Sequence, residues 1–131
     1  MSKSVLYAVN STPQNYIANG TVINFGTPVR RYGQNIDISG GNVVVAGTGY
    51  YSVDLNIGFT SAAGDVTVQV YKDGVAIQGA MAIVTAAATT SYSLTIPTLI
   101  RETCDCESTI TVVISGTAGT VNNASILVEK E

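Results

Sequence analysis

The sequence contains no histidine and no tryptophan, and charged residues make up only 11% of it. Without histidine, Ser-His-Asp and Cys-His catalysis are excluded, as are metal sites that use imidazole ligands. The nine Asp and Glu residues form no recognisable catalytic pair, and there is no Gly-rich phosphate loop with its lysine. We therefore predict that the chain is not an enzyme and that it uses no cofactor and no metal.

The positive charge is sparse and scattered. Six Lys and Arg residues stand against nine Asp and Glu, for a net charge of −3, and only Arg30 and Arg31 are adjacent. A nucleic-acid partner requires a basic patch or stripe, so nucleic-acid binding is not expected. No apolar run approaches the ~18 residues that a membrane-spanning helix needs, so membrane insertion is not expected either.

The first residues, Met1 to Tyr7, lack the apolar stretch and the cleavage site of a classical signal peptide. The chain is therefore expected to be made in the cytoplasm. If it functions outside the cell, release by lysis as part of a virus particle or a spore fits this pattern.

At 131 residues the chain has the length of one domain, which we place at residues 1–131. Hydrophobic residues make up 46% of it, while its 11% charge is well below the ~25% of an average soluble domain. One interpretation is a monomer coated with Ser, Thr and Asn. The other, which the composition favours, is an obligate oligomer that buries part of each subunit's surface.

Val, Ile, Thr and Tyr dominate the sequence, and turn residues interrupt them every 8–12 positions. This spacing, with no sustained helical periodicity, is typical of an all-β sandwich or barrel. Strands are predicted at Val5–Ser11, Thr21–Phe25, Asn35–Ile38, Asn42–Val45, Tyr50–Thr60, Asp65–Lys72, Val75–Val84, Thr90–Ile96, Thr109–Ser115 and Asn123–Glu129.

The clearest strand follows the Gly47-Thr48-Gly49 turn. Its side chains alternate, with Tyr51, Val53, Leu55, Ile57 and Phe59 on one face and polar residues on the other. A period of two predicts a strand with one buried face and one wet face. At the next turns, Asp73-Gly74 suits a tight type I′ hairpin, and Pro97 is expected to end its strand.

The last predicted strand has apolar residues on both faces. Ile126 and Val128 lie on one face, and Leu127 on the other. An apolar residue that points outward from a strand held in the middle of a sheet suggests a second burial partner, such as another subunit. Leu127 is therefore a candidate interface residue.

Thr103-Cys104-Asp105-Cys106-Glu107 is the one unusual local motif. The two cysteines can be reduced and incidental. They can also be bridged to each other through a very small, strained ring, or meet symmetry mates near an oligomer axis as intersubunit disulfides or a soft-metal site. Cys104 and Cys106 are thus candidates for a disulfide, within or between subunits.

The chain contains seven tyrosines, a residue type that is enriched at interfaces but is also common in the core of a β-sandwich. Tyr51 is expected in the core, whereas Tyr50, Tyr71 and Tyr92 are candidates for an interface or a ligand surface. Arg30 and Arg31 follow Pro28 in a predicted loop. They read either as a solvated turn or as a polar clasp toward another subunit or an acidic partner.

The order of segments resembles that of the C1q/TNF-like jelly-roll superfamily. The resemblance covers nearly the whole chain and is greatest for the bacterial and phage members typified by the C-terminal domain of the spore-surface glycoprotein BclA. It rests on Leu6–Ser11, Val22–Phe25, Gly33–Ile38, the Gly49-Tyr50-Tyr51 entry to a long strand, Val66–Ala80 and Ala124–Lys130. The sequence departs from the family pattern in lacking both a rich aromatic core and a preceding collagen-like Gly-X-Y stalk.

The resemblance implies a ten-stranded jelly-roll β-sandwich that forms a tight homotrimer. It further implies a structural or recognition module, displayed on a phage virion or on a spore or cell surface, that binds a glycan or a host surface protein through its loops. It carries over no catalytic residues. The alternative from the residues alone is a monomeric carbohydrate-binding or Ig-like adhesion sandwich, whose exposed tyrosines should cluster on one concave face.

Overall fold

The computed structural model describes residues 4–104 and 106–131, so residues 1–3 and Asp105, discussed above from the sequence, lie outside the described residues. These residues form two β-sheets and no helix that could cross a membrane. The first sheet contains β1 (Val5–Asn10), β2 (Gln14–Tyr16), β4 (Thr27–Tyr32), β7 (Gly49–Ser61), β10 (Ser91–Glu102) and β12 (Gly119–Lys130). The second contains β3 (Thr21–Val22), β5 (Ile36–Ser39), β6 (Asn42–Ala46), β8 (Gly64–Lys72), β9 (Val75–Ala86) and β11 (Glu107–Ser115).

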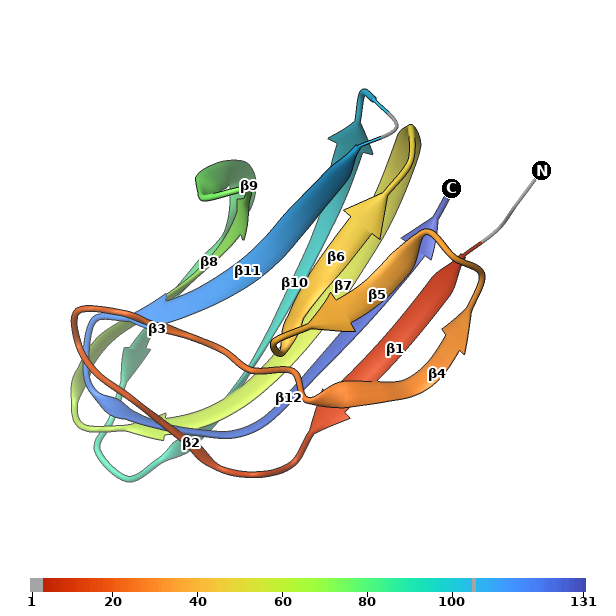
Figure 1. Cartoon of the computed structure of the whole chain (residues 1–131). Helices are drawn as coiled ribbons and strands as arrows, with labels where there is room; N and C mark the ends of the chain where they lie inside the picture. Colours follow the sequence, from red (N-terminus) through yellow and green to blue (C-terminus); the bar gives the residue numbers. More distant parts are fainter. Residues whose placement is uncertain (1–3, 105) are drawn as a thin grey trace.

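The two sheets pack face to face as a sandwich (Figure 1). In the first sheet the strand order is β10-β7-β12-β1-β4, and β2 also pairs with β12. In the second sheet the order is β5-β6-β11-β8-β9, and β3 also pairs with β11. Neighbouring strands are antiparallel. The last strand of the chain, β12, lies between β7 and β1, in the middle of its sheet as the sequence predicted.

The inward-facing residues of β7 lie at the centre of the hydrophobic core. Its five inward residues, Tyr51, Val53, Leu55, Ile57 and Phe59, are each no more than 1% exposed, which confirms the prediction. Across the sandwich they face the buried valines and isoleucines of β8 and β11. Because side chains alternate strictly along a strand, a one-residue slip of β7 would carry this whole set to the solvent face.

The tight turn predicted at Asp73-Gly74 is present. β8 ends at Lys72 and β9 begins at Val75, and the two turn residues have φ values of 50° and 82°. Positive φ at both central positions is the mark of a type I′ hairpin, whose twist matches that of the flanking strands.

Three details of the predicted fold were wrong. The described residues form twelve strands rather than ten, because β2 and β4 were not predicted. Arg30 and Arg31 lie in strand β4, which pairs with β1, and not in a loop. Pro97 does not end its strand: β10 continues to Glu102, with Pro97 opposite Asp54 of β7. β10 is an edge strand, where a residue without an N–H group is tolerated because one side of the strand has no partner.

Tyr51 ties the core to the turn that precedes β7. Its ring is fully buried, and its hydroxyl lies 2.8 Å from the carbonyl oxygens of both Ala46 and Gly47. We expect Tyr51→Phe to lower the free energy of unfolding by about 1–2 kcal/mol, because the partly buried carbonyl groups lose the tyrosine donor, although Ala46 O still accepts from Asn35 Nδ2. Urea denaturation measures this, with Tyr32→Phe as the control, because Tyr32 is 70% exposed. If the two substitutions lower the free energy of unfolding equally, the Tyr51 hydroxyl does not stabilise the turn before β7.

Candidate functional site

The core is incompletely covered on one side of the sandwich, where the edge strands β9 and β10 run. Among the described residues, six partly buried apolar side chains pack against the core, and five of them belong to β9 or β10. We call this group the open side: Ile77, Ala82, Val84, Tyr92 and Leu94. The sixth, Ile38, lies on β5 at the opposite edge of the second sheet.

The open side carries no charge. The sequence has no Asp, Glu, Lys or Arg between Asp73 and Arg101, a stretch that includes all of β9 and most of β10. Exposed apolar side chains flank the open side, with Met81 51%, Ile83 58% and Leu99 57% exposed. Proteins ordinarily protect long edge strands with charges or bulges, so an uncharged pair of edges favours association with another chain. This gap between charges is visible in the sequence, although the candidate residues named above do not include it.

A second apolar surface lies on the outer face of the first sheet. Val5, Tyr7 and Val9 alternate with the buried Leu6 and Ala8 along β1, so they point away from the core. Leu127, between the buried residues Ile126 and Val128 of β12, points the same way and stands directly opposite Tyr7. We call the group Val5, Tyr7, Val9 and Leu127 the first-sheet face.

Two of the residues singled out from the sequence, Tyr50 and Arg30, share this outer face with Leu127. Tyr50 is 47% exposed, and the guanidinium of Arg101 lies over its ring at 5.7 Å from the centroid. Arg30 is exposed on β4 and stands opposite Tyr7 in the register. The structure thus brings these predicted residues to one face, along the strand order β7-β12-β1-β4.

The other predicted surface residues lie elsewhere. Tyr71 is half-buried on β8 in the second sheet. Tyr92 belongs to the open side, where its ring stacks on Phe59 at 5.7 Å and its hydroxyl accepts a hydrogen bond from the Ala87 N–H. Arg31 turns toward β5, where its Nε donates to the Ile36 carbonyl. Tyr50 and Tyr71 therefore do not form the tyrosine cluster expected of a carbohydrate-binding sandwich.

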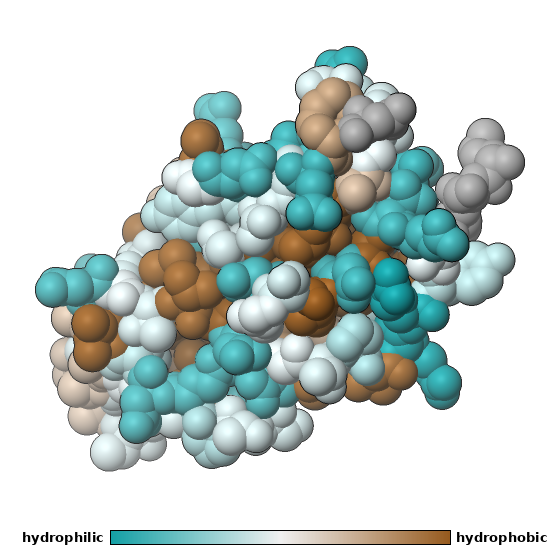
Figure 2. Space-filling view, in the orientation of Figure 1, coloured by the Kyte–Doolittle hydropathy of each residue, from teal (hydrophilic) through white to brown (hydrophobic). Residues whose placement is uncertain are grey.

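The remaining surface is mixed. On the face shown in Figure 2, apolar side chains occur in several groups separated by polar ones. A shallow depression between β5, β6 and β11 is lined by the acidic residues Asp37 and Glu107 together with Ile38, Ser39, Val44 and Thr109.

The hairpin that begins β9 is fastened to β11. The Asp73 carboxylate accepts a hydrogen bond from the Thr109 N–H at 2.9 Å, and the Asp73 N–H donates to the Thr109 carbonyl at 2.9 Å. The bond from the Thr109 backbone N–H lowers the pKa of the Asp73 carboxyl, because it stabilises the charged form. These contacts fix where the uncharged strand β9 starts.

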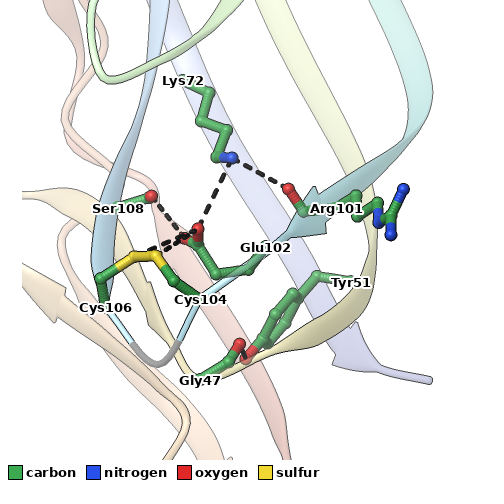
Figure 3. Close-up of a disulfide and its surroundings, with 8 residues drawn as sticks. All are labelled: Gly47, Tyr51, Lys72, Arg101, Glu102, Cys104, Cys106 and Ser108. Atoms are coloured by element: carbon green, nitrogen blue, oxygen red, sulfur yellow. Dashed lines mark hydrogen bonds and ion pairs between the residues drawn. A yellow bond between two sulfur atoms is a disulfide. The ribbon is translucent and has the colours of Figure 1, made fainter.

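Cys104 and Cys106 lie in the loop between β10 and β11, and the structure joins them to each other within the chain (Figure 3). Their Cα atoms are 5.2 Å apart, within the range that a disulfide spans. Among the arrangements considered from the sequence, this one was disfavoured because of its small ring.

A buried carboxylate lies beneath this loop. Glu102, at the end of β10, is only 3% exposed, and its Oε1 lies 3.9 Å from the Cys104 sulfur and 3.6 Å from the Cys106 sulfur. Its Oε2 accepts a hydrogen bond from the Ser108 hydroxyl, and Lys72 Nζ lies 3.8 Å from Oε1 (Figure 3). Glu102 could not be selected from the sequence, since glutamate is almost always exposed and its burial cannot be read from its neighbours.

No protein-family model and no curated protein sequence matches this chain. Its structure nevertheless aligns with solved structures over nearly its whole length. Murine APRIL at pH 5.0 aligns with a TM-score of 0.80 and 19% identity, covering 99% of this chain and 100% of that one. The globular domain of zebrafish complement 1qA aligns with a TM-score of 0.70 and 9% identity, covering 98% and 96%. The PRD1 vertex protein P5 aligns with a TM-score of 0.66 and 11% identity, covering 98% and 72%.

The fold is a C1q/TNF-like jelly roll. At these identities the alignments define the fold alone. They confirm the jelly-roll fold that the order of segments indicated. The particular closeness to the BclA domain stays a prediction from the sequence.

Proposed function

We propose that this C1q/TNF-like jelly roll is a non-enzymatic structural or recognition module that works as a homotrimer. The observation that carries the proposal is the open side, where the core is half-covered and a long stretch of sequence has no charge. Such an edge resembles a core cut in half, which is the character of obligate interfaces. We propose that a second copy of the chain covers the open side, because each copy also carries a separate apolar surface, the first-sheet face, that can pack against it.

The counterpart surface is the first-sheet face. The open side and the first-sheet face are different patches on different parts of the sandwich. When two different patches meet head to tail, the assembly closes as a ring if the rotation permits. A ring of three agrees with the homotrimer that the superfamily resemblance implies.

Display on a virion, spore or cell surface is part of the proposal. It is supported by the alignment with a vertex protein, P5 of PRD1. In a trimer that buries the open side, the loops at the ends of the sandwich and the outer face of the second sheet stay accessible. We propose that these surfaces bind the external partner, a glycan or a host surface protein, since loops on a rigid scaffold commonly carry recognition.

Light scattering after size exclusion tests the oligomeric state. The expected mass is about 40 kDa, three times the 13.5 kDa of the chain, with and without reductant. Reductant should not change it, because the cysteines pair within one chain. A monomer at micromolar concentration would overturn the proposal and favour the monomeric carbohydrate-binding alternative.

A further inference from the structure

The most unusual chemistry of the chain lies at the end of β10, outside the surfaces discussed above. Glu102, Cys104 and Cys106 each offer a ligand atom, and these atoms all lie within 4.8 Å of one another. Sulfur and carboxylate oxygen are both ligands of Zn²⁺ and related ions. To the two cysteines that the sequence offers, the structure adds Glu102 as a third donor within the same chain.

The carboxylate is held in place for this arrangement. Ser108 donates to Oε2, which leaves Oε1 directed at the two sulfurs. Glu102 is buried, so its charge is costly unless it is compensated. Carboxylates that ligate metals in proteins are themselves hydrogen-bonded, which orients them toward the ion.

The disulfide leaves this carboxylate facing sulfur atoms that carry no proton and cannot donate to it. Opening the bond takes two electrons and two protons and yields two thiols. Two molecules of a thiol reductant supply both and become a disulfide, whereas a phosphine supplies the electrons, water supplies the protons, and the phosphine becomes its oxide. An ion that then binds displaces both protons, because the ligands are thiolates. The reducing interior of a cell keeps such thiols open, whereas an oxidising environment closes them.

We propose that the reduced chain binds one borderline-soft divalent cation, of the Zn²⁺ class, through Glu102, Cys104 and Cys106. Two thiolates and one carboxylate bring three negative charges, which the ion and the Lys72 ammonium neutralise together. Zn–S bonds of about 2.3 Å in a tetrahedral site place the sulfurs roughly 3.8 Å apart. Cysteines with Cα atoms 5.2 Å apart reach this separation by side-chain rotation. The fourth position is left to water or to another ligand.

Titration of the phosphine-reduced full chain with Co²⁺ under anaerobic conditions, followed by competition with Zn²⁺, tests the proposal. The expected result is one ion per chain, a thiolate-to-cobalt charge-transfer band and release of about two protons. The oxidised chain, which needs no substitution, should show none of these. Cys104→Ser should abolish the band.

The role of the carboxylate is tested by a matched pair of variants. Glu102→Gln should weaken Zn²⁺ binding at least tenfold. Glu107→Gln, an exposed carboxylate next to Cys106, should leave the affinity unchanged. Unchanged affinity in Glu102→Gln would overturn the three-ligand site. Equal binding by the reduced and oxidised chains, or one ion shared by two or three chains, would also overturn it.

Discussion

Leu94→Lys is expected to convert the assembled protein into folded monomers of 13.5 kDa. Leu94 lies on the open side, half-buried against the core, in a stretch that contains no charge. In the proposed assembly a neighbouring subunit covers this position, so a lysine there must lose its water. The effective cost of burying an unpaired charge is several kcal/mol, which weakens each contact about 100-fold or more. In the monomer the lysine stem can keep its apolar contact while the ammonium reaches solvent.

Ile38→Lys is the matched control. Ile38 is also an apolar residue that is partly buried against the core, but it lies on β5, at the opposite edge of the second sheet. We expect this variant to lose a similar amount of stability in thermal unfolding and yet to keep the 40 kDa mass. Both masses come from light scattering at equal protein concentration. Loss of assembly in both variants, or in neither, would contradict the assignment of the open side as an interface.

Gly116→Ala is expected to destabilise the fold by about 3 kcal/mol or more, the range of the most severe single substitutions. Gly116, which follows β11, has φ +105°, a conformation that L residues rarely adopt. A Cβ built there would lie 2.3 Å from the Asp65 carbonyl oxygen, which belongs to the backbone of β8. The side chain therefore meets both backbone strain and an obstacle that cannot rotate away.

Gly40→Ala separates these two causes. Gly40, in the turn between β5 and β6, also has a positive φ of +59°, but a Cβ there meets nothing within 4 Å. Its expected cost is the left-handed backbone penalty alone, roughly 1–2 kcal/mol. Urea denaturation of both variants at one protein concentration gives the difference. If Gly116→Ala costs no more than Gly40→Ala, the close approach of the β11–β12 loop to β8 is not a determinant of stability.

Strands with one buried face could be predicted from the sequence, because a core imposes its period of two on the residue pattern. β7 is the clearest case, and the Asp73-Gly74 turn could be predicted because few residues tolerate two positive φ values in succession. β4 could not be predicted in this way. All six of its residues are exposed, so burial leaves no alternation in its sequence.

Pro97 shows how a local rule depends on tertiary position. Proline interrupts a strand that is paired on both sides, because every N–H of such a strand has an acceptor, and β10 has a partner on one side alone within the described sheet. Whether a strand lies at the edge or in the middle of a sheet is decided by long-range pairing. The residues next to Pro97 in the sequence therefore do not indicate that its strand lies at the edge of a sheet.

The candidate site residues likewise divide into those that a local pattern predicts and those that depend on long-range pairing. Leu127 could be identified, because an apolar residue between Ile126 and Val128 must point away from the core that they enter. The open side was missed because its half-burial depends on where β9 and β10 end up in space, although the absence of charge was visible. Glu102 was missed because the approach of Ser108 and Lys72 is created by the pairing of β11 with β8 and cannot be read from the local sequence.

The central claim is that the open side of one subunit packs on the first-sheet face of the next, and mixing two interface variants tests it most directly. Leu94→Lys damages the open side, and Leu127→Lys damages the first-sheet face. Each alone should be monomeric, because every contact in the ring uses one surface of each kind.

In an equimolar mixture, the intact open side of Leu127→Lys can still pack on the intact first-sheet face of Leu94→Lys, so one contact forms per pair. Native mass spectrometry, with one variant labelled with ¹⁵N since the two have equal mass, should therefore detect a heterodimer of about 27 kDa, twice the chain's 13.5 kDa. An assembled Leu127→Lys protein, or a mixture that contains only monomers, would contradict the head-to-tail trimer.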